Sequence, residues 1–120
     1  MARPSPKIVV VIAADPMNSH RAVEALRIAL GLGSHNEGMD LSIILSGRAP
    51  FLLSDDTSDI IDGDILEKHF PVFVEWGTVF SLMTDAEFPS SYVHGCLTQP
   101  ILPQDTATTL EAADRVLIFS

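Results

Sequence analysis

The feature that most constrains the fold is an apolar run near the N-terminus that leads, through a short turn, into a helical pattern. Ile8 to Ala13 is continuously apolar and rich in β-branched side chains, which is typical of a strand covered on both faces of a parallel sheet. Past the turn, apolar side chains recur at helical spacing, at Ala22, Val23, Leu26, Ala29 and Leu30. Gly31 and Gly33 mark the helix end, so this stretch predicts the first half of a βαβ unit.

The turn between this strand and helix, Asp15 to Arg21, allows two interpretations. Asn18 or Ser19 can cap the helix by accepting a hydrogen bond from its first free N–H groups. The same N-terminus, with His20 beside it, can also bind a small anion. The loop has neither a G-x-G-x-x-G pattern nor a P-loop lysine, so it gives little support to a nucleotide-binding domain.

The middle of the chain continues the alternation of strands and helices. Residues 41–45, LSIIL, predict the second strand, and 49–53 a short helical turn limited by Pro50. Residues 65–70 predict a helix that Pro71 ends. Val72 to Trp76 then predicts the third strand, followed by a brief helical segment at 79–83, although 72–83 also fits one apolar helix.

The remainder predicts an irregular loop, a helix and a last strand. Residues 84–103 contain three prolines and read as a long loop, whereas 105–113 predict a helix and 115–119, RVLIF, a strand. The whole chain, residues 1–120, is therefore expected to be a single α/β domain. We expect three layers, an open and mostly parallel sheet with helices on both faces.

Parallel sheets of this kind bind ligands outside the carboxyl ends of their strands. On the predicted elements, that rule selects three segments, Ala14–His20, Ser46–Arg48 with Gly47, and Trp76–Thr78 with Gly77. Trp76 is the only tryptophan, and we expect it to lie in a ligand pocket, at a subunit contact or in the core.

Composition excludes several classes of function. The formal net charge of −9, from 16 acidic and seven basic side chains, argues against general nucleic-acid binding. No apolar run is long enough to span a membrane, and the N-terminus has no signal-peptide pattern. A single cysteine cannot form an internal disulfide, so we expect a cytoplasmic protein.

Metal binding has weak support in the sequence, and we predict no metal site and no cofactor. Five aspartates lie between residues 55 and 64, but their spacing does not match an EF-hand loop and a solvated loop is the simpler interpretation. A zinc site could combine His94 and Cys96 with another histidine, but these residues form no recognised ligand spacing.

Two local patterns resemble the DsrE/DsrF-like family, the small sulfur-relay subunits of the DsrEFH and TusBCD type. One is the opening KIVVVIAADPMNSHRAVEALRIAL, and the other is the ending TTLEAADRVLIFS. The resemblance implies a DsrE-like fold of flavodoxin or Rossmann-like topology, and homo-oligomers or assemblies with related subunits. It also implies that active subunits carry sulfur as a persulfide on a cysteine just after the third strand. On the predicted strand that position falls near Glu75 to Gly77, where no cysteine occurs.

The resemblance leaves two hypotheses about function, and whether the chain is an enzyme stays open. In the first, the chain is a sulfur-relay subunit with Cys96 as the carrier and His94 lowering the pKa of its thiol. In the second, it is a non-catalytic oligomeric subunit that binds a small anion or a partner protein. A buried cysteine without reactivity fits the second hypothesis, because free cysteines are often buried.

Overall fold

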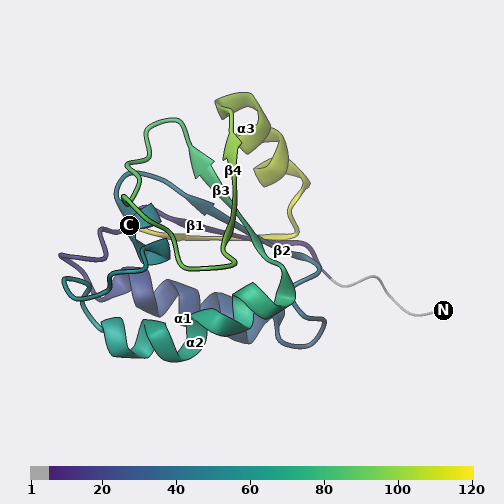
Figure 1. Cartoon of the computed structure of the whole chain (residues 1–120). Helices are drawn as coiled ribbons and strands as arrows, with labels where there is room; N and C mark the ends of the chain where they lie inside the picture. Colours follow the sequence, from purple (N-terminus) through teal and green to yellow (C-terminus); the bar gives the residue numbers. More distant parts are fainter. Residues whose placement is uncertain (1–5) are drawn as a thin grey trace.

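The computed structural model describes residues 6–120 as a five-stranded parallel sheet with helices on both faces (Figure 1). In chain order the elements are β1 (Ile8–Ile12), α1 (Arg21–Gly33), β2 (Leu41–Leu45), η1 (Ala49–Leu53), α2 (Gly63–Trp76), β3 (Val79–Met83), β4 (Leu97–Ile101), α3 (Pro103–Ala112) and β5 (Arg115–Phe119). The strand order is β4-β3-β2-β1-β5, and all four pairings are parallel. The predicted fold class is confirmed.

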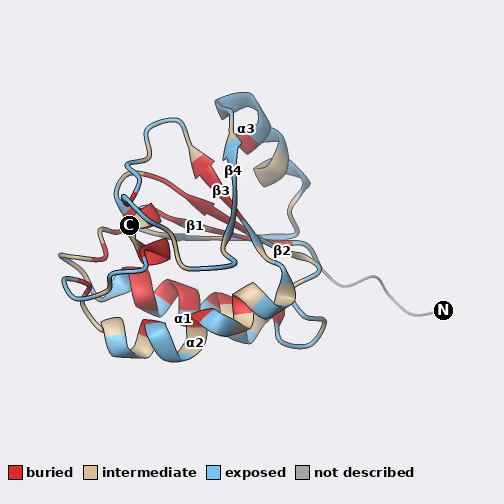
Figure 2. Cartoon of the chain, viewed as in Figure 1, coloured by how far each residue is buried: buried red, intermediate tan, exposed pale blue. Residues whose placement is uncertain are grey.

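The main core lies between the sheet and the helices α1 and α2, which cover the same face (Figures 1 and 2). Alternate residues of the strands face these helices, as the period of two in a strand requires. Val10, Ile43 and Phe80 are each 1% exposed or less. The apolar stripe predicted for the first helix is buried, apart from the partly buried Leu30, so the first βαβ unit is confirmed.

Among residues 6–120, α3 is the helix that covers the opposite face of the sheet, and it does so much less completely (Figure 2). Thr106 is the one buried residue of this helix. Val116 and Ile118 of the edge strand β5 are 41% and 63% exposed. None of the helices in residues 6–120 combines the length and apolar character needed to cross a bilayer.

The predicted third strand is wrong, because residues 72–76 form the second half of α2. Pro71 lies inside this helix and does not end it. A helix places Phe70, Phe73 and Trp76 on one side, where Phe73 contacts both other rings at centroid distances of 6.2 and 5.6 Å. This aromatic packing outweighs the strand preference of the valines and the cost of an internal proline.

Gly77 ends α2 and lets the chain turn into the true third strand. It adopts the left-handed conformation with φ at +69°, and its N–H donates to the Val74 carbonyl at 3.0 Å. The N–H of Thr78 donates to the Phe73 carbonyl at 3.0 Å, which completes a Schellman motif. Residues 79–83, predicted as a helical segment, are therefore β3.

The stretch 84–103 is also only partly a loop, since it contains the edge strand β4. Pro100 is tolerated there because β4 pairs on one side only. The predicted last strand is confirmed at Arg115–Phe119, and the last helix begins at Pro103, two residues earlier than predicted.

Candidate functional site

The candidate site lies at the carboxyl edge of the sheet, where the loops after β1, β2 and β3 meet. Because β3 ends at Met83, the third loop begins at Thr84. The predicted segments Ala14–His20 and Ser46–Arg48 do lie at this edge, since they follow β1 and β2.

Asp15 organises the loop after β1. Its two carboxylate oxygens accept hydrogen bonds from the Met17 N–H at 2.9 Å and from the Asn18 side-chain amide at 2.7 Å. Asn18 is thus held by Asp15 and does not cap the helix. Ser19 Oγ accepts a hydrogen bond from the N–H of Arg21, the first residue of α1, at 3.0 Å, but the N-cap residue is His20, which makes no side-chain capping bond.

The N-terminus of α1 already has a carboxylate beside it. His20 Nδ1 lies 2.9 Å from Asp62 Oδ2, which comes from the loop before α2. Asp62 has φ at +62°, an uncommon conformation outside glycine, so the backbone is held in a specific turn here. An external anion at His20 would have to compete with this side chain.

Arg48 connects all three loops. Its Nε lies 3.6 Å from Asp15 Oδ2 and 3.6 Å from Glu87 Oε2, and its guanidinium lies 5.3 Å from the centre of the Phe51 ring. Gly47, with φ at +56°, accepts a hydrogen bond from the Glu87 N–H at 2.7 Å. The positive charge of Arg48 is therefore matched by two carboxylates, Asp15 and Glu87, and Arg48 is not a free cation for a ligand.

A groove of about 310 Å³ lies at the carboxyl ends of β3 and β4. Thr84 and Phe88 line it from the loop after β3, and Tyr92 lines it from the chain leading to β4. Phe88 is 58% exposed, which is unusual for such a large apolar side chain. The pKa of Tyr92 is raised by its burial and by the nearby Cys96.

Cys96 lies at the opposite edge, because it directly precedes β4 and β4 runs parallel to its neighbour. The thiol is partly buried against the main core, and this burial raises its pKa to about 11. His94 is exposed and lines a separate pocket with Leu66 and Pro71. The structure thus gives no cationic partner to the thiol within residues 6–120 that would lower its pKa.

Trp76 and Gly77 are also misplaced by the sequence prediction, since they precede β3 and lie at the amino edge. The Trp76 ring packs against the Gly33–Gly38 turn, where a Cβ added to Gly38 would lie 2.9 Å from Trp76 Cε3. Gly77 caps α2. Both residues serve the packing of this edge.

Three residues of the site escaped the sequence analysis, namely Thr84, Glu87 and Phe88. The sequence analysis did not select them because it placed β3 seven residues too early. The rule that ligands bind at the carboxyl ends of strands then selected Trp76–Thr78 instead. Across residues 6–120, no group of three or more His, Cys, Asp or Glu side chains is arranged to hold a metal ion.

Comparison with solved structures gives a match to a crystal structure of the ychN protein from E. coli. The TM-score is 0.71 at 20% sequence identity, and the match covers 96% of this chain and 100% of the other. No protein-family model and no curated sequence matches the chain. The ychN protein is a DsrE/DsrF-like protein, so the resemblance drawn from the sequence is confirmed at the level of the fold. This chain therefore has the fold of the DsrE/DsrF-like proteins.

Proposed function

We propose that this chain is a non-catalytic subunit of the DsrE/DsrF-like type, which assembles with copies of itself or with related subunits in the cytoplasm and does not carry sulfur. The observation that supports this proposal most strongly is the position and burial of Cys96, the only cysteine in the sequence. Cys96 is at the amino edge of the sheet, partly buried, and its pKa of about 11 leaves little thiolate at neutral pH.

The position that would carry sulfur holds a residue unable to do so. The resemblance places the carrier cysteine just after the third strand, and with β3 ending at Met83 that residue is Thr84. A threonine hydroxyl cannot form a persulfide. Thr84 lines the groove together with the exposed Phe88.

Phe88 is the residue we expect to mediate assembly. An exposed aromatic ring beside an apolar groove at the same edge matches the composition of subunit interfaces, where aromatic side chains are enriched. A second copy, or a related subunit, is the partner that the resemblance implies. A small anion is a weaker candidate at this edge because Arg48 is already paired.

Two measurements test the two parts of the proposal. Intact mass after incubation with glutathione persulfide should show no reducible gain of one sulfur atom, for the wild type as for Cys96→Ser. A gain in the wild type alone would establish the sulfur-relay hypothesis, with Cys96 as the carrier.

Sedimentation velocity at micromolar concentration should show an oligomer that Phe88→Ser weakens. Met39→Ser is the matched control, because Met39 is 84% exposed and lies near the amino end of β2, away from the groove. A monomeric wild type, or equal behaviour of the two variants, would contradict assembly through Phe88.

A further inference from the structure

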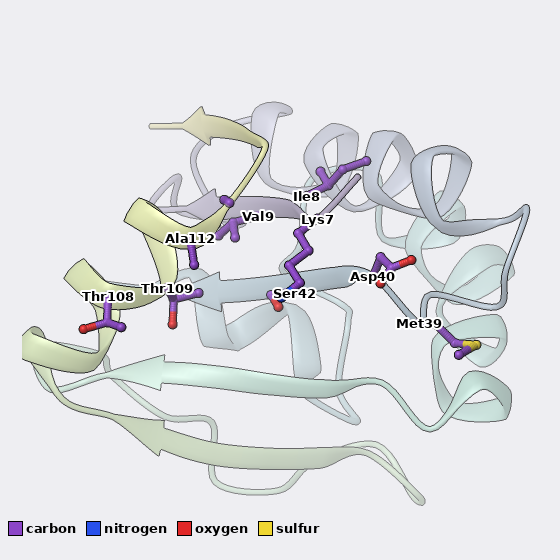
Figure 3. A pocket seen from close by; sticks show the side chains of 10 residues that line it. Lys7, Ile8, Val9, Met39, Asp40, Ser42, Thr108, Thr109 and Ala112 are labelled. Carbon is purple, nitrogen blue, oxygen red and sulfur yellow. The ribbon is translucent and has the colours of Figure 1, made fainter. Parts of the chain in front are cut away.

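A second cavity lies on the face of the sheet that α3 covers, toward the amino ends of the strands. It has a volume of about 370 Å³ and is separate from the groove at the carboxyl edge. Val9 and Ser42, which are neighbours in the β1–β2 register, line it from the sheet (Figure 3). Thr109 and Ala112 line it from α3.

The cavity exists because α3 presents short side chains to the sheet. Where a covering helix would normally place leucine or isoleucine, this helix offers Thr108, Thr109 and Ala112. The space between helix and sheet is therefore left open over β2, and its volume falls in the lower range of small-molecule pockets.

Ser42 is an unusual residue for its place in the sheet. β2 is the central strand, and its other four residues are all apolar, as expected of a strand buried between helices. Ser42 is exposed in the cavity, so its hydroxyl is available to a ligand.

Lys7 brings a positive charge to the same cavity. In Figure 3 its side chain extends toward Ser42, whereas Asp40 lies at the far rim. The Asp40 carboxylate accepts a hydrogen bond from the Asn36 side-chain amide at 3.0 Å. No carboxylate in residues 6–120 forms an ion pair with Lys7, and residues 1–5 contain no acidic side chain.

The polar groups left to a ligand are therefore mostly donors. Thr108 already donates its hydroxyl to the Gln104 carbonyl at 3.0 Å, which leaves the Lys7 ammonium and the hydroxyls of Ser42 and Thr109. One ammonium and two hydroxyls suit an anionic oxygen group. Val9, Met39 and Ala112 add an apolar wall beside it.

We propose that this cavity binds a small organic monocarboxylate, with its carboxylate on Lys7, Ser42 and Thr109 and its aliphatic body against Val9 and Met39. The protein's net charge of −9 disfavours a ligand with two or more negative charges, because Lys7 is the one cationic side chain among the described residues that line the cavity. The cavity is distinct from the carboxyl-edge groove. A result that refutes monocarboxylate binding would therefore leave the proposed function unaffected.

Titration of the isotope-labelled 120-residue chain with hexanoate, followed by amide NMR shifts, tests the proposal. Hexanoate should shift the amides of Ser42 and Thr109 in a saturable manner. Hexanol, which has the same apolar body without charge, and inorganic phosphate, which has charge without that body, should bind at least tenfold more weakly. Stronger binding of phosphate, or equal binding of hexanol, would overturn the assignment to a monocarboxylate.

Two variants test which residues hold the ligand. Lys7→Gln should weaken hexanoate binding about tenfold to hundredfold, which is the range for one hydrogen bond to a charged group. Lys68→Gln is the matched control, because Lys68 is exposed on α2, on the other face of the sheet, and this variant should bind as the wild type does.

Ser42→Val should also weaken binding while keeping the strand, because valine favours β-structure and fills part of the cavity. Unchanged amide shifts outside the cavity would show that each variant is folded. Hexanoate binding that is the same in Lys7→Gln as in the wild type would refute the site.

Discussion

Replacing Pro71 by alanine is expected to stabilise the protein, because Pro71 interrupts the hydrogen bonds of α2. It is the ninth residue of a 14-residue helix. A proline there has no N–H to donate to the carbonyl four residues earlier, that of Glu67, and its ring crowds that carbonyl. Pro71 is exposed, so little packing is lost when its ring is removed.

The size of the gain follows from opposing contributions. An internal proline costs a helix about 3 kcal/mol relative to alanine, and the restored hydrogen bond alone is worth about 1 kcal/mol. Against this, removing a proline frees the unfolded chain, which costs about 0.4 to 1 kcal/mol. We expect a net increase of about 1 to 2 kcal/mol in the free energy of unfolding, or roughly 4 to 8 °C in Tm.

Urea denaturation and a thermal melt followed by circular dichroism measure this gain. The control is Pro103→Ala, because Pro103 is at the first position of α3, where proline is favourable. That variant should be unchanged or less stable. If Pro71→Ala were also neutral or destabilising, residues 72–76 would not continue the helix. The positions of β3 and of the carboxyl-edge site, which depend on that helix, would then be wrong.

Three further changes test single features of the structure. Alkylation of Cys96 by iodoacetamide at pH 8 should be roughly a hundredfold slower than that of a free thiol and should accelerate up to a pKa of about 11. The thiol's raised pKa also means that its contribution to stability is present below about pH 9 and declines as pH approaches 11. Gly38→Ala should lower the free energy of unfolding, measured by denaturation, by about 1 to 3 kcal/mol, because φ is +77° and the new Cβ meets Trp76. Gly31→Ala, with open space around it, should raise that free energy by up to about 1 kcal/mol. Arg48→Met should change the free energy of unfolding by less than about 1 kcal/mol, since both of its ion pairs are long and exposed.

The sequence was sufficient for the first βαβ unit and for the last strand, because local pattern and burial agree there. Ile8 to Ile12 is β-branched and buried on both faces, so no other element fits it. It was not sufficient for residues 72–83, where valines and phenylalanines satisfy a strand and a helix equally well. Only the contacts of Phe73 with Phe70, Phe80 and Trp76 decide for the helix, and these depend on the packed structure.

The same ambiguity determined how much of the site could be predicted. Ser19 and Gly47 follow strands that were placed correctly, so the sequence locates them at the carboxyl edge. Trp76 and Gly77 were assigned there only because β3 was placed too early. Arg48, Asp15 and Glu87 form the contacts of that edge, yet ion pairs between residues 33 and 39 positions apart leave no local pattern to detect.

The corrected position of β3 also bears on the proposal that this chain does not carry sulfur. With the predicted strand, the family position fell on Glu75 to Gly77, and Cys96 could still be placed near it by a long loop. With β3 at Val79–Met83, Cys96 directly precedes the neighbouring parallel strand β4, whereas Thr84 follows the carboxyl end of β3. Cys96 nevertheless lies near Tyr92, which lines the carboxyl-edge groove, so the raised pKa of its thiol, and not its distance from the groove, argues against a persulfide role. The proposed loss of the persulfide role therefore rests on the raised pKa of the Cys96 thiol and on the threonine that follows β3.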